Sequence, residues 1–292
     1  MMKKIGIVTD SHSSLSPAAA EALGVHVLPM PFRIGTVDYL EGVNLTREEF
    51  FAHQRAGDII GTSQPAPADV LALWDRLLTQ YESLLYMPIS SGLSGSCETA
   101  QLLADDEAYA GRVFVVDNGR IATPLHRSIL DAMELIDQGL TAAQCKAALE
   151  QSRDELTIYI AVQTLEYLHK GGRISGATAA VGTILNIKPI LSLTTGKLES
   201  YKKARGMLKA KEIMLESIRS DLAIRFADAQ SRGDVHLLAA GSASPEETAK
   251  WIAQIEAAFP GMPVLYDDLS LGVSCHTGEG ALGVGLSVRP RP

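Results

Sequence analysis

The strongest constraint on the fold is the alternation of strand-like and helix-like segments along the first half of the chain. Short apolar runs rich in β-branched residues predict buried strands, and the segments between them have the apolar spacing of helices. The predicted strands lie at residues 3–9, 25–31, 84–89 and 112–117. Helix starts are indicated by Ser16 before Pro17 and by capping boxes that begin at Thr46 and Thr141. This alternation favours an α/β sheet that binds its ligand beyond the carboxyl ends of the strands.

The second half of the chain continues the α/β pattern after a predicted break near residues 152–156. A Gly-rich stretch over 170–182 is followed by two short predicted strands, near 190–193 and 198–202. A long helix is then predicted over 207–228, and further strand and helix signals follow. At roughly 150 residues per domain, a chain of 292 residues is long enough for two domains.

The composition is that of a globular, acidic chain. Hydrophobic residues make up 46% of the sequence and aromatic residues 5%, so a packed core would be mostly aliphatic. The 26 Lys and Arg residues against 34 Asp and Glu residues give a formal net charge of −8. Because nucleic-acid binding depends on basic surface, nucleic acid is not an expected partner.

The cysteines and the termini favour a cytoplasmic protein. Cys97, Cys145 and Cys275 form no paired motif, so neither a disulfide framework nor a four-cysteine zinc site is expected. The first residues become polar too early for a signal-peptide core. The longest uncharged stretch, 174–187, is too short to span a membrane.

The sequence contains few signatures of catalytic centres. It has no Gly-x-x-x-x-Gly-Lys-[Ser/Thr] loop for ATP, no His-Glu-x-x-His zinc motif and no Gly-x-Ser-x-Gly nucleophile elbow. The chain around Ser94 misses the elbow spacing by one position. We therefore expect neither a catalytic residue nor a metal ligand in this chain.

Two hydroxyl-rich loops are candidate binding elements. Thr62 and Ser63 precede one predicted helix, and four serines lie between residues 90 and 96, after a predicted strand. Ser94 and the backbone of Gly95 would then lie at a helix N-terminus, where hydroxyls and free N–H groups can bind a phosphate or a carboxylate. The same residues can also simply cap helices and form turns, and the sequence leaves both interpretations open.

Three further residues are candidates from their local sequence. His276 follows Cys275 in a Gly-rich segment where we expect a loop, and neighbours in an extended loop point apart, so His276 should not activate that thiol. Arg173 follows two glycines, whose backbone could present its guanidinium to a ligand. Alternatively, Arg173 is a solvated residue after the end of a helix. Arg205 ends a basic run, which is either a strand end in water or a docking patch for an anionic group.

Six motifs in order along nearly the whole chain resemble those of the DegV family. They are Val8–Ser11, Thr62–Pro65, Ile89–Ser96, Leu165–Leu168 with Lys170–Ser175, Lys188–Leu191, and His276–Gly278 with Gly280. The resemblance implies two α/β domains, with a parallel sheet in residues 1–155 and a mixed sheet in residues 156–292. It also implies that the chain buries one long-chain fatty acid, such as palmitate or oleate, between or within its domains.

The resemblance further implies a role for the bound lipid. Related proteins are binding subunits of a bacterial fatty acid kinase: they present the acyl carboxylate to a separate dihydroxyacetone-kinase-like subunit, which holds ATP and Mg²⁺ and makes acyl-phosphate. The carboxylate-binding residues implied by the motifs are Thr62, Ser63, Ser94, Gly95 and His276. Arg173 and Arg205 fall where the family has basic residues near the site or the kinase surface. Such a chain needs no cofactor of its own, and transient membrane contact during lipid exchange is expected.

One departure from the family pattern bears on the implied site. Glu279 stands where the family usually has proline after His-Thr-Gly, which adds an acid close to a carboxylate site. Because a carboxylate facing the ligand would repel it, we predict that Glu279 points to solvent.

Two other functions are compatible with the same residues. Ser94 and His276 could serve a Ser-dependent hydrolase, for which no orienting acid is evident from the sequence. The serine-rich loop could instead bind the phosphate of a sugar phosphate in a regulatory protein.

Overall fold

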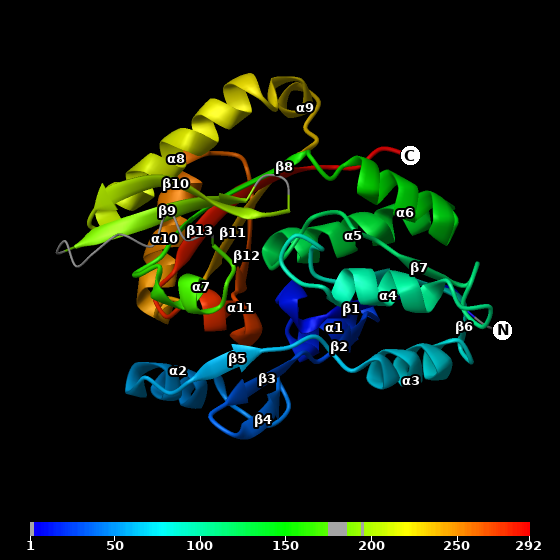
Figure 1. Ribbon diagram of the computed structural model, residues 1–292. Helices are drawn as coiled ribbons and strands as arrows, with labels where there is room; N and C mark the ends of the chain where they lie inside the picture. Colours follow the sequence, from blue (N-terminus) through cyan, green and yellow to red (C-terminus); the bar gives the residue numbers. More distant parts are fainter. Residues whose placement is uncertain (1–2, 175–185, 194–195) are drawn as a thin grey trace.

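The computed structural model describes residues 3–174, 186–193 and 196–292. Ser175, the rest of the Gly-rich stretch up to 182, most of the uncharged stretch 174–187 and the Thr194–Thr195 turn lie outside the described residues. Within the described ranges the strands form three sheets, and helices pack against them in an α/β arrangement (Figure 1).

The first sheet is parallel, as the sequence predicted, and its four strands run in the order β2-β1-β6-β7. Its strands are β1 (Lys3–Asp10), β2 (His26–Leu28), β6 (Tyr81–Met87) and β7 (Val113–Val115). The surrounding helices are the short 3-10 turn η1 (Ser11–Ser13), α1 (Pro17–Leu23), α3 (Pro67–Leu77), α4 (Ser96–Ala104), α5 (Thr123–Asp137) and α6 (Ala142–Gln151). Alternate residues of β6 face two layers: Leu85 and Met87 pack with α1, α5 and α6, and Leu84 and Tyr86 pack with α3 and α4.

A small antiparallel sheet in the order β4-β3-β5 was not expected from the sequence. It consists of β3 (Pro31–Ile34), β4 (Val37–Leu40) and β5 (Ile60–Thr62), with α2 (Arg47–Ala56) between β4 and β5. The single strand predicted over 25–31 is therefore wrong, because the chain leaves the parallel sheet after Leu28 and enters β3 at Pro31. Pro29 and Pro31 lack the N–H groups that would continue the first ladder.

The third sheet is mixed, also as expected, and has the order β10-β9-β8-β13-β11-β12. Its strands are β8 (Leu156–Ala161), β9 (Ile187–Leu193), β10 (Leu198–Arg205), β11 (Val235–Gly241), β12 (Val264–Asp268) and β13 (Leu282–Val288). The pair β11 and β12 is parallel, and the other neighbouring pairs are antiparallel. All of these strands follow residue 155, whereas the strands of the other two sheets precede it.

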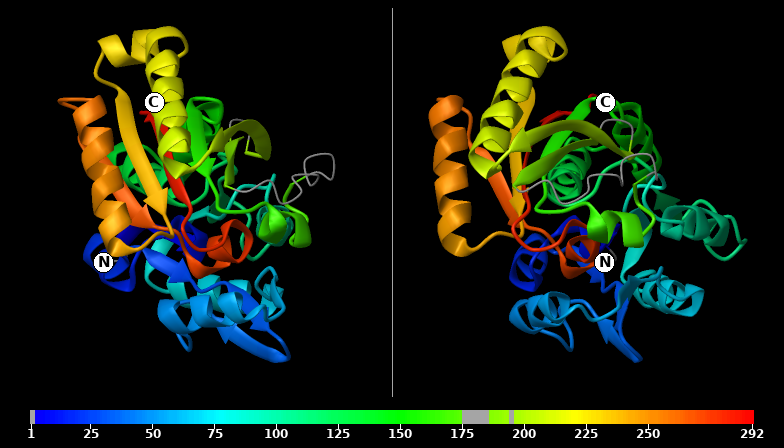
Figure 2. Two further views of the ribbon diagram at one scale, coloured as in Figure 1. Left: turned by 90° about the vertical axis from the view of Figure 1, so that its left-hand side faces the viewer. Right: turned by 60° about the vertical axis from the view of Figure 1, so that its left-hand side comes forward.

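The helices of the second half divide between the two faces of the mixed sheet. They are α7 (Glu166–Lys170), α8 (Met207–Ile224), α9 (Ala227–Ser231), α10 (Pro245–Ala258) and α11 (Leu271–Thr277). Helices α8 and α10 cover the outer face, as Figure 2 shows, and α7 and α11 lie on the inner side, toward the small sheet. The helix predicted over 207–228 is two helices, because the chain turns between them and buries Phe226 in the core under α8.

Helix α5 joins the two halves of the molecule. It packs against β11, β12 and β13 as well as α6. The hydroxyl of Thr123 donates to the carbonyl of Ala239 (2.9 Å), and His126 Nδ1 lies 3.0 Å from the Asp267 carboxylate. The inner face of the mixed sheet therefore meets the N-terminal half along the start of α5.

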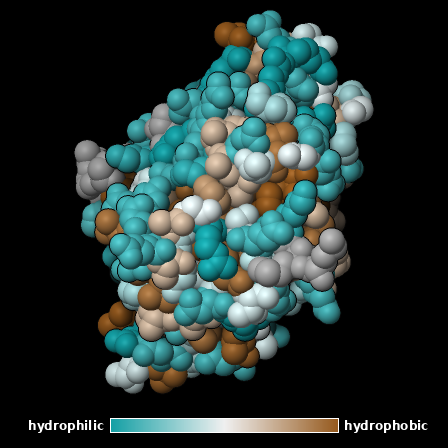
Figure 3. Space-filling view, turned by 90° about the vertical axis from the view of Figure 1, so that its right-hand side faces the viewer, coloured by the Kyte–Doolittle hydropathy of each residue, from teal (hydrophilic) through white to brown (hydrophobic). Residues whose placement is uncertain are grey.

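The surface shown in Figure 3, which is the right-hand side of Figure 1, is mostly hydrophilic, with apolar residues in separate groups. Of the helices within the described ranges, none is both long enough and apolar enough to cross a membrane.

Candidate functional site

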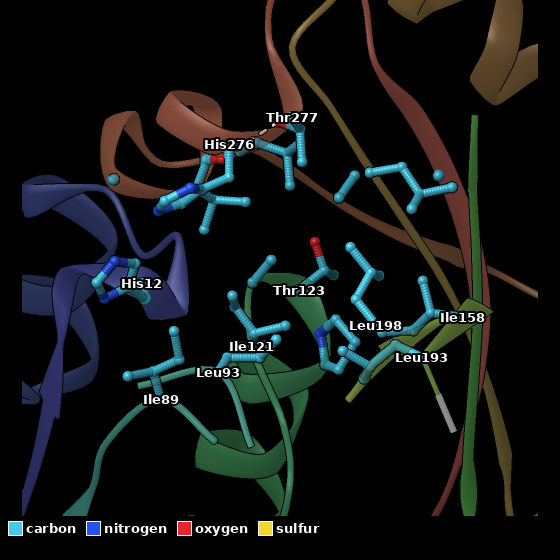
Figure 4. Close-up of a pocket in the computed structure, with 18 of the residues that line it drawn as sticks. His12, Ile89, Leu93, Ile121, Thr123, Ile158, Leu193, Leu198, His276 and Thr277 are labelled. Carbon is cyan, nitrogen blue, oxygen red and sulfur yellow. Dashed lines mark hydrogen bonds between the residues drawn. The ribbon is translucent and has the colours of Figure 1, made fainter. Parts of the chain in front are cut away.

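A deep cavity lies between the inner face of the mixed sheet and the N-terminal half (Figure 4). With its mouth included, it contains about 1020 Å³ of space that protein atoms leave free. Most of its wall is aliphatic and comes from both halves of the chain. The aliphatic wall includes Ile89, Leu93, Ile121, Ile158, Ile160, Leu168, Leu193, Leu198, Leu238, Leu269 and Val273. A concave cavity with this aliphatic lining suits a slender apolar ligand.

The glycines of the central strand β13 make room for this cavity. Leu282, Val284 and Leu286 pack under α8 and α10, whereas Gly283 and Gly285 alternate with them and line the cavity. Because successive side chains of a strand point to opposite faces, the two positions of β13 that face the cavity have no side chain to fill it; Val284 between them also belongs to the wall. The alternation of large residues with glycine over 282–286 is a sequence signal that could have located the cavity.

The polar residues expected from the motifs gather at one end of the cavity. Thr62, Ser63, Ser94, Arg173 and His276 all belong to its wall. Ser94 and Arg173 also line a hollow on the outer surface, which Leu93 and Leu198 of the apolar wall reach as well. We call the end of the cavity at His276 and Arg173 the mouth; Figure 4 shows His276 at this end and Ile158 and Leu193 away from it. One end of the cavity is thus polar and the body is apolar.

Thr62 and His276 are in direct contact at the mouth. Thr62 is the last residue of β5, and its Oγ1 lies 3.0 Å from Nε2 of His276. The expectation that His276 lies in a loop is wrong, because it occupies the last turn of helix α11. That helix is fixed by contacts distant in sequence: the Glu41 carboxylate accepts hydrogen bonds from the backbone N–H groups of Leu271 and Gly272.

Gly171 allows α7 to approach the His276 ring. A Cβ atom at position 171 would lie 2.1 Å from His276 Nδ1, so any side chain there would displace the imidazole. Nδ1 is buried and has no hydrogen-bond partner among the described residues. The ring is therefore held by packing on one side and by the Thr62 hydroxyl on the other.

His276 is neutral in this environment. Burial, together with the positive charges of Arg173 and His12, lowers the pKa of His276 to about 4. A neutral imidazole whose Nε2–H donates to Thr62 Oγ1 leaves the Thr62 hydroxyl free to donate to a carboxylate oxygen, without adding a second charge. Thr62 and His276 are thus suited to orient a polar head group rather than to neutralise it.

The serine-rich loop is held mainly by structural contacts. Ser90 Oγ donates to the carbonyl of Gly196 (2.9 Å), and Ser91 Oγ donates to the Asp117 carboxylate (2.6 Å). Ser94 Oγ accepts from the backbone N–H of Ser96 (3.3 Å) at the start of α4 and also faces the cavity. Gly95 is the exposed N-cap residue of α4 and is not part of the cavity wall formed by the described residues. The structure therefore brings Ser94, but not Gly95, to the candidate site.

The two candidate arginines occupy different places. Arg173 is half-buried at the mouth, and its guanidinium donates to the carbonyl of Gly171 (2.6 Å). Arg205 ends β10 on the exposed surface and is not among the described residues that line the cavity. Arg173 can act on a bound head group directly, whereas Arg205 could act only on a partner at the surface.

The contacts of Ser94 and His276 do not form a nucleophile–base pair. His276 Nε2 is engaged by Thr62, and no acid orients its other ring nitrogen within the described part of the chain. The neighbouring Cys275 is buried, and burial raises the pKa of its thiol well above the ordinary value. Neither Ser94 nor Cys275 is therefore activated as the nucleophile of a hydrolase.

Comparison with known proteins agrees with this fold. The model of a family described as uncharacterised proteins of the DegV family matches residues 4–289. The chain belongs to the DegV family. A DegV domain-containing protein of Deinococcus radiodurans is 33% identical to it over 285 residues, which cover 97% of this chain and 98% of the relative.

Two solved DegV structures are also similar. A structure described as fatty acid binding of a DegV family protein from Thermus thermophilus is 32% identical, has a TM-score of 0.85, and matches over 98% of this chain and 99% of that one. DegV from Bacillus subtilis, described as a fatty acid binding protein, is 26% identical with a TM-score of 0.81, over 98% and 99% of the two chains. The six motifs therefore identified the DegV family correctly, and the parallel N-terminal sheet and the mixed C-terminal sheet that the resemblance implies are both present.

The Glu279 departure from the DegV pattern does not place an acid in the cavity. The Glu279 carboxylate is exposed and pairs with Arg55 on α2 at 2.8 Å. The prediction that it points to solvent is confirmed.

His12 lines the cavity and was not singled out from the sequence. It lies in turn η1 directly after β1, is buried, and belongs to the cavity wall near the mouth. Its position beyond the carboxyl end of a parallel strand is the signal that could have found it, because ligands of open α/β sheets bind there.

Proposed function

We propose that this chain binds one long-chain fatty acid, such as palmitate or oleate, and presents its carboxylate to a partner kinase subunit. In this proposal the acyl chain occupies the apolar body of the cavity. Thr62, Ser94 and His276 bind the carboxylate, with Ser63 beside them. Arg173 and Arg205 lie toward the kinase.

The observation that carries the proposal is that one cavity combines a largely aliphatic wall with polar residues gathered around His276. Each buried CH₂ contributes about 0.8 kcal/mol, so a fifteen-carbon tail would gain on the order of 12 kcal/mol before the costs of association. The tail must therefore supply most of the affinity. The polar end then determines which end of the lipid faces the mouth.

The polar end is suited to a carboxylate for a second reason. A buried carboxylate is costly unless it is hydrogen-bonded, and the mouth offers two hydroxyls and an imidazole close to a guanidinium. The fatty-acid-binding descriptions of the DegV proteins from Thermus thermophilus and Bacillus subtilis support the same ligand class. A sugar phosphate would leave its hydroxyls against aliphatic walls without partners, so it fits this cavity poorly.

The kinase part of the proposal depends on the orientation of the lipid. A carboxylate at the mouth adjoins the surface hollow that contains Arg173 and Lys197, where a second protein could reach it. The partner that fits is a dihydroxyacetone-kinase-like subunit that brings ATP and Mg²⁺, and this chain would need no cofactor of its own.

The binding proposal is tested by titrating delipidated protein with oleate, with oleyl alcohol and with glucose 6-phosphate while measuring thermal unfolding. Oleate at one hundred times its Kd should stabilise the folded protein by about 2.7 kcal/mol. Oleyl alcohol should stabilise it less, and the sugar phosphate should have no effect. Stabilisation by the sugar phosphate and not by oleate would contradict the proposal.

A further inference from the structure

The mouth of the cavity contains a second histidine besides His276. His12 is only 7% exposed, lines the cavity wall, and lies beside the end of the cavity that holds His276 in Figure 4. The two rings come from opposite halves of the chain, His12 from turn η1 and His276 from α11. A head group at the mouth would lie within reach of both rings.

A fixed carboxylate backs the His12 ring. Asp10 is fully buried, and its two carboxylate oxygens accept hydrogen bonds from the backbone N–H groups of His12 and Ile89, each at 2.9 Å. The first of these oxygens lies 3.4 Å from His12 Nδ1. Because Asp10 is held by backbone on both sides, it cannot turn away from the ring. The Nδ1 edge of His12 therefore always faces the Asp10 carboxyl group.

The other edge of the ring lies against helix α11. A Cβ atom at position 272 would be 2.6 Å from His12 Nε2, so Gly272 makes the space that this edge occupies. Gly272 also belongs to the cavity wall and lies one helical turn before His276. The Nε2 edge thus lies beside the cavity wall at Gly272, at the end where the carboxylate is proposed to lie, and Glu41 Oε2 lies 3.5 Å from the same Cβ position.

The charged groups around His12 favour its protonated form. Asp10 on β1 and Glu41 after β4 are acidic side chains, and Arg173 after α7 is basic. Burial lowers the pKa of His12, but the Asp10 carboxylate 3.4 Å from Nδ1, together with Glu41, outweighs burial and raises the pKa above the ordinary 6.5. The pKa of His276, in contrast, is lowered to about 4. Of the two histidines at the mouth, His12 is the one whose surroundings favour the imidazolium.

We propose that His12 is a proton-dependent binding residue, which holds the lipid carboxylate through Nε2 as an imidazolium and releases it more readily when neutral. This inference rests on the proposed fatty-acid function. When neutral with its proton on Nδ1 toward Asp10, His12 would present a lone pair to the carboxylate. When protonated, it presents an N–H donor and a positive charge. Binding of the carboxylate is thus coupled to uptake of one proton.

The sign of the coupling follows from linkage. A carboxylate beside His12 stabilises the imidazolium and raises the pKa of His12 further. Affinity is therefore highest below the pKa of His12 in the free protein and falls as the pH rises through the pKa in the complex. Each unit by which the ligand raises that pKa corresponds to about a tenfold difference in affinity between the two limits.

The test compares Kd values of delipidated protein at pH 6 and pH 9 for the wild type, His12→Gln and His53→Gln. His53 is the matched control, because it is a partly exposed histidine on α2 that pairs with Asp58 (2.7 Å) outside the cavity. The ligands are oleate and oleyl alcohol, which share the tail. Protonation of the oleate carboxylate affects all three proteins equally, so it does not contribute to the difference between them.

Between pH 6 and pH 9 the oleate affinity of the wild type and of His53→Gln should fall. This fall should exceed that of His12→Gln by about tenfold or more. Oleyl alcohol should bind all three proteins without this dependence. Equal losses of oleate affinity in the wild type and in His12→Gln would overturn the proposed role of His12. They would not contradict the proposed fatty-acid binding itself. Failure of the wild type to bind oleate at either pH would instead overturn the proposed function.

A measurement on the wild type covers the case in which His12→Gln does not fold. The ring C–H resonances of His12 are followed by NMR against pH for the free protein and for its complexes with oleate and with oleyl alcohol. Oleate should raise the pKa of His12, and oleyl alcohol should not. An unchanged His12 titration in the oleate complex would refute the proposal.

Discussion

Thr62 Oγ1 and His276 Nε2 lie 3.0 Å apart at the mouth of the cavity, although 214 positions separate the two residues in the sequence. The hydrogen bond joins the end of β5 in the small N-terminal sheet to the last turn of α11. It follows that the polar end of the cavity is complete only when the two halves of the chain pack together.

Replacing Thr62 with valine should weaken fatty-acid binding without unfolding the protein. Valine keeps the shape of the side chain and removes its hydroxyl. Because hydrogen bonds to charged groups contribute about 1.5–3 kcal/mol, the affinity for oleate should fall roughly tenfold to a hundredfold. Calorimetric titration measures the change, with Thr79→Val as the control, since Thr79 is exposed after α3 and outside the cavity. Equal affinities of the two variants would show that Thr62 does not bind the head group.

Gly171→Ala should disturb the site through sterics alone. The backbone of Gly171 has an ordinary φ of −78°, so alanine fits the backbone, but its Cβ would lie 2.1 Å from His276 Nδ1. The imidazole must then move away from Thr62, and we expect a loss of oleate affinity of about tenfold or more, as for a lost charged hydrogen bond. Gly61→Ala, next to Thr62 and with no atom within 4 Å of its added Cβ, is the control and should bind normally. Normal binding by Gly171→Ala would contradict the assigned role of His276.

Gly283→Leu should shorten the acyl chain that the cavity accepts. The Cβ atom at position 283 would make ordinary contacts of 3.4–3.6 Å, so a side chain can be added, and from there it extends into the cavity. Since each excluded CH₂ forfeits about 0.8 kcal/mol, palmitate should lose far more affinity than decanoate. Gly283→Ala should behave nearly as the wild type. A parallel loss for both fatty acids would mean that the tail does not run along β13.

The two arginines should separate lipid binding from kinase coupling. Arg205 is exposed and outside the cavity wall, so Arg205→Ala should keep the oleate affinity and lower the rate of acyl-phosphate formation with a partner kinase subunit. Arg173→Ala should lower both, because Arg173 lines the mouth. Acyl-phosphate trapped as the hydroxamate measures the rate, with Arg219→Ala on the outer helix α8 as the control. Unchanged rates in both variants would exclude these arginines from the kinase surface.

The sequence predicted those parts of the fold that depend on local signals. The capping boxes at Thr46 and Thr141 are both present, because a cap is formed within four consecutive residues. Strand β13 was not predicted, because glycines at positions 283 and 285 lower strand propensity, and the strand is stabilised by its neighbours β8 and β11.

The candidate site, like the fold, could be predicted only where local sequence signals define it. Thr62, Ser94 and His276 could be named from their motifs, but the helical state of His276 could not be, because the seven-residue helix α11 is held at its N-terminus by Glu41, 230 positions away. His12 was missed because its role depends on Asp10 behind it and Gly272 opposite it. Contacts of this kind are set by tertiary packing, which no local pattern encodes.

The most direct test of the account is the mass of lipid released by denaturation from freshly purified protein. The account predicts one long-chain fatty acid per chain in the wild type, and much less in Gly283→Leu, whose added side chain takes up space in the tail region. Release of no fatty acid from the wild type, together with no uptake of added palmitate or oleate, would contradict the central claim.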